Sequence, residues 1–167
     1  MKRIVILGST GSIGTQTVDV VRQHPEELEI VGLAVNTRVQ EMLEQARAHK
    51  VKNLAVGDER LAQAPLVSEV REQAAGGLCG YGMDAVVDLV RLPEADVVVN
   101  ALVGAAGLRA SFETLRAGKV LALANKESLV VGGDLIMPLA ARVDEQRRAA
   151  GVAPKVGPAG ALMPIDS

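Results

Sequence analysis

The sequence contains almost no aromatic residues: its 167 residues include one tyrosine, one phenylalanine and no tryptophan. Proteins that bind single-stranded nucleic acid stack bases on aromatic side chains, so this composition argues against that function. The formal net charge of −2 also provides no overall positive field to attract nucleic acid or an acidic membrane surface. We therefore expect neither nucleic acid nor a membrane as a partner.

Cysteine, histidine and long apolar runs are also scarce. Cys79 is the only cysteine, so no disulfide forms within the chain, and we expect a small buried or half-buried residue rather than a nucleophile. With two histidines, the sequence offers no Ser-His-Asp set and no cysteine–histidine metal cluster. No run of about 18 apolar residues is present, and the apolar stretch at 3–7 is too short for a signal peptide. These features predict a cytoplasmic protein.

What the sequence does contain is an alternation of apolar strand-like runs and helical patterns. Continuous apolar runs such as Val97-Val98-Val99 are typical of parallel strands that are covered on both faces. The predicted strands are 3–7, 28–35, 53–56, 96–102, 119–124 and 161–165, and the predicted helices are 13–23, 38–49, 82–92, 106–117 and 127–149. Residues 57–80 are ambiguous apart from a short helix at 58–64. The alternation predicts a doubly wound parallel sheet of the Rossmann-like α/β class, with helices on both faces.

A glycine-rich turn follows the first predicted strand directly. It reads Gly8-Ser-Thr-Gly11-Ser-Ile-Gly14 and leads into a helix. Glycine permits positive φ in a tight turn and lets a pyrophosphate approach the backbone, while the helix start offers free N–H groups. The G-x-x-G-x-x-G spacing differs from the commonest dinucleotide motif. We interpret the turn as a dinucleotide site; the alternative is a plain tight βα turn.

The end of the second predicted strand indicates which dinucleotide would bind. An acidic residue there would hydrogen-bond the ribose 2′-hydroxyl of NAD, but no Asp or Glu lies between Val31 and Gln40. Asn36, Thr37 and Arg38 follow the strand instead, and a guanidinium is a bidentate partner for a 2′-phosphate. This favours NADP over NAD, with a solvated Arg38 as the alternative.

Three further segments follow predicted strands. Residues 100–107 carry glycines that suit either close ligand approach or tight strand–helix packing, and both readings stay open. Asn125 is a candidate N-cap, and Lys126 stands where a helix start disfavours a cation, which suggests an anionic partner or else a plain surface lysine. Asp166 is a candidate metal ligand or catalytic carboxylate.

Four motifs together resemble the 1-deoxy-D-xylulose 5-phosphate reductoisomerase family: the turn at 8–14, Val-Gly-Ala-Ala-Gly-Leu at 103–108, Leu-Ala-Asn-Lys-Glu-Ser-Leu at 123–129, and Met-Pro-Ile-Asp-Ser at 163–167. The resemblance covers the chain in order. It implies an enzyme of the non-mevalonate isoprenoid route that rearranges and reduces 1-deoxy-D-xylulose 5-phosphate to 2-C-methyl-D-erythritol 4-phosphate. It further implies NADPH, a divalent Mg²⁺ or Mn²⁺ ion, a sugar-phosphate substrate and a homodimer at full length.

The resemblance also implies roles for particular residues. The cofactor would be bound by the turn residues Gly8, Thr10, Gly11, Ser12, Ile13 and Gly14, with Thr10, Gly11, Ser12 and Ile13 in contact with its phosphates. Asn36, Thr37 and Arg38 would lie by the adenosine ribose, and Asn125 and Glu127 by the nicotinamide. Lys126 would be catalytic and meet the substrate, Asp166 would be catalytic and the first metal ligand, and Ser167 would contact substrate. The family commonly has its basic residue one position before Arg38, so the contact with the 2′-phosphate falls to Thr37 or Arg38.

The resemblance extends beyond this chain. We expect residues 1–167 to be an NADPH-binding domain, with the catalytic and C-terminal helical domains of the family absent, and therefore to bind cofactor without turnover. Two other readings remain: a free-standing dinucleotide-sensing module, and another NADP-dependent dehydrogenase.

Overall fold

A computed structural model describes residues 1–124, 126–151 and 161–165, with only the backbone described for 126–131. Seven strands form one sheet in the order β4-β3-β2-β1-β5-β6-β7, and every neighbouring pair is parallel. The strands are β1 (Lys2–Leu7), β2 (Leu28–Val35), β3 (Leu54–Val56), β4 (Cys79–Tyr81), β5 (Val97–Asn100), β6 (Val120–Leu123) and β7 (Leu162–Pro164). The order reverses between β1 and β5, which confirms the doubly wound Rossmann-like prediction.

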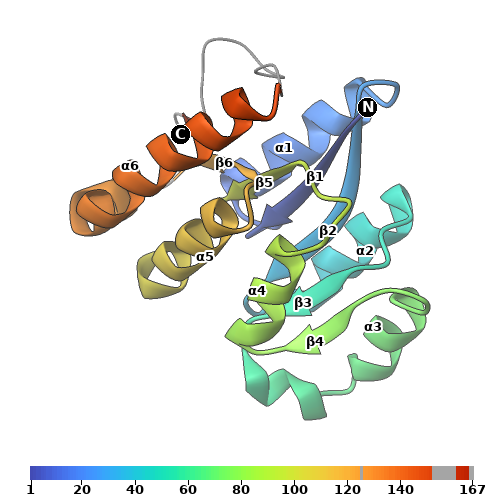
Figure 1. Ribbon diagram of the computed structural model, residues 1–167. Coiled ribbons are helices and arrows are strands. Elements are labelled where there is room, and N and C mark those ends of the chain that lie inside the picture. The colour runs from blue at the N-terminus through green and yellow to red at the C-terminus, as the bar shows by residue number, and fades with distance from the viewer. Residues whose placement is uncertain (125, 152–160, 166–167) are drawn as a thin grey trace.

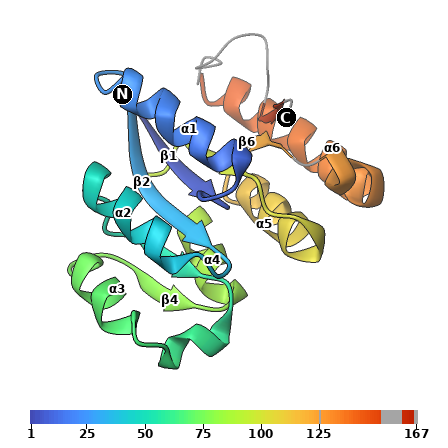
Figure 2. The same ribbon diagram turned by 180° about the vertical axis from the view of Figure 1, so that it is seen from behind.

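Helices cover both faces of the sheet, as predicted. One face carries α1 (Ser12–Gln23), α2 (Val39–His49) and α3 (Val67–Gln73), and a 3₁₀ turn, η1 (Glu59–Gln63), precedes α3. The other face carries α4 (Met83–Val90), α5 (Gly104–Arg116) and α6 (Lys126–Ala149). Figures 1 and 2 show these two layers from opposite sides. No helix in the described ranges is long and apolar enough to cross a membrane.

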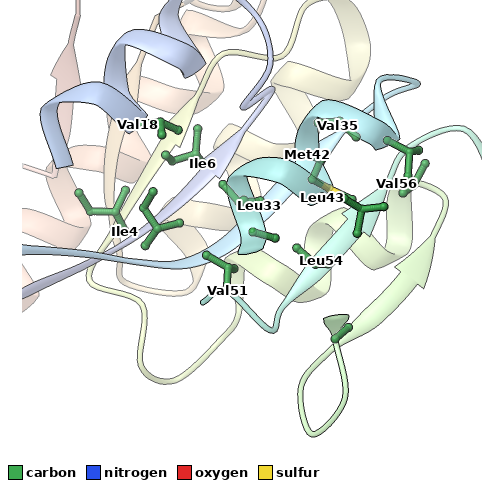
Figure 3. Close-up of a cluster of buried hydrophobic side chains, with 14 of the residues drawn as sticks. Ile4, Ile6, Val18, Leu33, Val35, Met42, Leu43, Val51, Leu54 and Val56 are labelled. Atoms are coloured by element: carbon green, nitrogen blue, oxygen red, sulfur yellow. The ribbon is translucent and has the colours of Figure 1, made fainter. Parts of the chain in front are cut away.

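Alternate residues of the strands feed two cores. Ile4 and Ile6 of β1 point toward the α1 and α2 layer, while Val5 and Leu7 pack against the α4 layer. Figure 3 shows the first core, which includes Leu33 of β2 and Met42 of α2; both side chains are fully buried. Because strands covered on both faces need apolar residues at every position, the short apolar runs in the sequence were a sound strand signal.

The predicted elements are present with ends that agree to within two residues, but two elements between 57 and 81 were not predicted. These are α3 and β4. Strand β4 has three residues with Gly80 at its centre, and the side chain of Asn53 positions it: Leu78 N–H donates to Asn53 Oδ1 over 2.9 Å. Because a residue distant in sequence holds the segment that leads into this short strand, the local sequence carries little of the apolar pattern that predicts a strand.

Cys79 is exposed on edge strand β4, so the expectation of a buried or half-buried cysteine was wrong. Partial desolvation nevertheless raises the pKa of the Cys79 thiol, while the positive charge of Arg71 opposes that rise. A raised pKa leaves little thiolate at neutral pH, so the thiol remains a poor candidate nucleophile.

Candidate dinucleotide-binding site

The candidate site lies where β1 and β5 end, at the reversal of strand order. Backbone hydrogen bonds join the segments that follow the strands: Gly8 N–H donates to Ala34 O over 2.8 Å, and Ala101 N–H donates to Leu7 O over 2.9 Å. A Cβ on Gly8 would lie 3.1 Å from Ala101 O, so the glycine turn sits directly against the β5–α5 loop. Ligands of open α/β sheets bind outside strand ends at such a reversal.

The three glycines of the turn have three different environments. Gly8 has φ +80°, which glycine adopts without steric cost. A Cβ on Gly14 would lie 2.1 Å from Gly8 O, so this glycine is required for packing of α1 against the turn. At Gly11 φ is −77°, and a Cβ would meet only Gly8 O, at 3.6 Å. The fold therefore has no need of glycine at Gly11, which leaves its surface open to a ligand.

The turn and the start of α1 present unpaired donors. Within the described residues, the N–H groups of Thr10, Ser12, Ile13 and Gly14 donate to no protein acceptor. Helix α1 has no side-chain cap and no acidic residue in its first turn. Four free N–H groups at the positive end of a helix form an anion site of the kind that holds phosphate.

Arg38 reaches this turn from the end of β2. It occupies the N-cap position of α2, and its Nη1 donates to Thr10 O over 3.4 Å. Asn36 and Thr37 are exposed beside it. The structure thus brings the two predicted groups, at the glycine turn and after β2, to one place. The guanidinium is exposed and has no carboxylate partner in the described ranges, so it can meet an anion.

Sequence reasoning missed the end of β3, which borders the same place. Asp58 N–H donates to Asn36 O over 3.2 Å, and the Asp58 carboxylate binds Arg60. The hydrogen bond from Arg60 lowers the pKa of Asp58. This acid is therefore already paired with a cation. A strand followed by Gly57-Asp58 was a usable signal, since loops after neighbouring parallel strands share one edge.

Gln45 of α2 was also missed. Its Nε2 donates to Ser9 O over 2.9 Å, so a helix residue distant in sequence holds the phosphate turn. A single glutamine on a polar helix face gives no sequence signal of this contact.

The β5–α5 loop resolves the two readings left open for its glycines. A Cβ on Gly107 would lie 2.5 Å from Leu102 O, so Gly107 serves packing, whereas Gly104 has nothing within 4 Å. Fully buried Asn100 fixes the loop by donating to Gly107 O and Ser111 Oγ, both over 2.8 Å. Val103 is 77% exposed at the N-cap of α5.

For the remaining predicted site residues, the structure describes no side-chain positions. Lys126 and Glu127 begin α6, and the structure describes only their backbone. Asn125, Asp166 and Ser167 lie outside the described residues. Their predicted roles in nicotinamide, metal and substrate binding therefore stay predictions.

Far from this edge, His24, Glu26 and Glu27 bring possible ligand atoms within 4.8 Å of one another, but all three are exposed, as ordinary surface charges are.

The parallel sheet with reversed strand order and the glycine turn with free N–H groups define a Rossmann-like domain with a dinucleotide-type phosphate site. Comparisons with known proteins narrow this class. The family model for 1-deoxy-D-xylulose 5-phosphate reductoisomerase matches residues 4–133. The chain belongs to the 1-deoxy-D-xylulose 5-phosphate reductoisomerase family.

Curated relatives and solved structures agree. The reductoisomerase of Mycobacterium leprae (strain Br4923) is 48% identical over 139 residues, which is 83% of this chain and 32% of the relative. That of Desulfitobacterium hafniense is 46% identical over 145 residues, 86% of this chain and 37% of the relative. The chain thus spans about a third of the length of these relatives.

Two solved structures cover nearly the whole chain. A crystal structure of DOX-P reductoisomerase in complex with NADPH, fosmidomycin and magnesium matches with a TM-score of 0.79 and 30% identity, over 99% of this chain and 36% of that one. The Zymomonas mobilis enzyme in complex with NADPH matches with a TM-score of 0.74 and 28% identity, over 99% and 38%.

Proposed function

We propose that this chain binds NADPH and forms the cofactor-binding part of an enzyme that converts 1-deoxy-D-xylulose 5-phosphate to 2-C-methyl-D-erythritol 4-phosphate. The observation that carries the proposal is the set of free N–H groups at Thr10, Ser12, Ile13 and Gly14, beside the open surface of Gly11. Family membership supports it, because related enzymes have been solved in complex with NADPH.

The chain's own residues would bind and orient the cofactor. The free N–H groups would hold the pyrophosphate, and the helix dipole of α1 adds a favourable field. Arg38, tethered to Thr10 O, would hold the 2′-phosphate together with Asn36 and Thr37. Arg38 has no carboxylate partner among the described side chains, and Asp58 already pairs with Arg60; both observations favour a phosphorylated ribose over a plain one.

Calorimetric titration of the 167-residue chain with NADPH and NADH tests the preference. One charge-assisted contact contributes about 1.5–3 kcal/mol, so NADPH should bind about tenfold or more tightly. Arg38→Met should remove most of that difference. Arg47→Met is the matched control, because Arg47 is an exposed arginine of the same helix that pairs with Glu69 instead. Equal dissociation constants for the two cofactors in the parent would contradict the proposal.

The catalytic part of the proposal depends on residues whose side chains the structure does not describe. Asn125 and Glu127 would border the nicotinamide, Lys126 and Ser167 would meet substrate, and Asp166 would be the first ligand of Mg²⁺ or Mn²⁺. A bound divalent ion supplies Lewis-acid polarisation and orients the substrate oxygens. We also propose that the substrate is a sugar phosphate, that the full-length protein is a homodimer and that it is located in the cytoplasm.

We further infer that the 167-residue chain binds cofactor without turnover. Hard divalent cations take six or so oxygen ligands, and Asp166 is one candidate carboxylate. The assay mixes the chain with NADPH, Mn²⁺ and 1-deoxy-D-xylulose 5-phosphate and follows nicotinamide absorbance. Substrate-dependent NADPH oxidation at ordinary enzyme rates would refute this inference.

A further inference from the structure

Gln45 places a buried amide against the phosphate turn from the neighbouring helix. It lies seven residues after Arg38 on α2, so both side chains reach the turn from one side of that helix. Gln45 Nε2 donates to Ser9 O over 2.9 Å. Because a carbonyl oxygen only accepts hydrogen bonds, this contact also fixes which end of the amide faces the turn.

The contact determines the direction of a donor on the opposite side. Ser9 C=O and Thr10 N–H belong to one planar trans peptide, so they point in opposite directions. The contact with Gln45 therefore holds the Thr10 N–H, one of the free donors, pointing away from the Gln45 side chain. The Ser9 N–H is fixed separately, since it donates to Ala34 O over 3.1 Å.

Fold stability alone does not account for a glutamine here. Within the described residues, Gln45 Oε1 and Ser9 Oγ are buried without a hydrogen-bond partner. An apolar side chain of the same shape would remove the unpartnered Gln45 Oε1 but would leave Ser9 O without its donor, so the two desolvation costs nearly cancel and the glutamine adds little net stability. The contact with Ser9 O is thus best explained by what it does to the turn.

We propose that Gln45 is a positioning residue, which holds the Ser9–Thr10 peptide so that the Thr10 N–H is preorganised for a cofactor phosphate. The inference rests on the proposed NADPH binding. It separates two functions of α2: Arg38 reads the 2′-phosphate, and Gln45 sets the pyrophosphate donor that NADPH and NADH share.

The test replaces Gln45 by the isosteric Met and measures dissociation constants for NADPH and NADH, the melting temperature, and the ¹⁵N–¹H resonance of Thr10. Gln45→Met should weaken both cofactors about tenfold, leave their ratio unchanged, shift the Thr10 resonance and change the melting temperature only slightly, because one buried orphan acceptor replaces another. Gln45→Glu, which keeps size but loses the donor and adds a negative charge beside the turn, should weaken binding further.

Gln73→Met is the matched control. Gln73 Nε2 donates to Ala46 O and Val51 O over 3.2 and 3.0 Å and, within the described residues, makes no hydrogen bond to the turn at 8–14, so this variant should lose stability and keep parental binding. If both Gln45 variants bind the cofactors with parental affinity, the role of Gln45 is refuted while the proposed NADPH binding stands. The same holds if the variants lose the preference for NADPH over NADH, because α2 would then have moved as a whole and displaced Arg38. A parent chain that does not bind NADPH would overturn the proposed function, and this inference with it.

Discussion

Substitutions at Gly11 and Gly14 should separate ligand binding from folding. At Gly11 the backbone is at φ −77° and ψ −179°, which any residue adopts, and a Cβ would meet only Gly8 O at 3.6 Å. Gly11→Val should therefore change the free energy of unfolding by no more than about 1 kcal/mol, the size of an N-cap effect. At Gly14 a Cβ would lie 2.1 Å from Gly8 O and 2.6 Å from Ser9 Cα. The turn must then shift, so Gly14→Ala should destabilise the fold by about 1–3 kcal/mol.

For NADPH affinity, in contrast to stability, Gly11→Val should have the larger effect. Valine at position 11 would cover the N–H groups that meet the phosphates. Losing two charge-assisted hydrogen bonds of about 1.5 kcal/mol each removes about 3 kcal/mol, or more than hundredfold in affinity. Urea unfolding and NADPH calorimetry on the same samples measure both quantities. A folded Gly11→Val chain with parental affinity would refute the assignment of this turn to the phosphates.

Two other predictions concern residues outside the turn. Asn100→Ala should lower the free energy of unfolding by about 2–4 kcal/mol, because it removes the two buried hydrogen bonds to Gly107 O and Ser111 Oγ; a loss below about 0.5 kcal/mol in urea unfolding would count against this role. Cys79 should react with iodoacetamide at pH 8 more slowly in the folded chain than in urea, because its raised pKa reduces the thiolate fraction. Faster reaction in the folded state would show that Arg71 outweighs desolvation.

The sequence was informative where local pattern determines structure. Apolar runs such as Val97-Val98-Val99 predicted buried parallel strands, and the glycine motif predicted the tight turn between β1 and α1. It was uninformative where distant residues decide. Strand β4 depends on the Asn53 side chain, and the hold of Gln45 on Ser9 joins residues 36 positions apart.

The motif also does not reveal that its glycines differ in role. The sequence motif does not distinguish Gly8, Gly11 and Gly14, whereas the structure shows that Gly14 is required for packing and that Gly11 has room for a side chain. The identity of a ligand-facing glycine depends on the three-dimensional path of the turn, which spacing alone does not specify.

A crystal structure of this chain with NADPH tests the central claim most directly. We expect pyrophosphate oxygens within hydrogen-bonding distance of the N–H groups of Thr10, Ser12 and Ile13, and the 2′-phosphate beside Arg38. The Thr10 N–H should point at a phosphate while Gln45 still holds Ser9 O. Cofactor bound elsewhere on the chain, or a pyrophosphate that does not touch the turn at 8–14, would contradict the account.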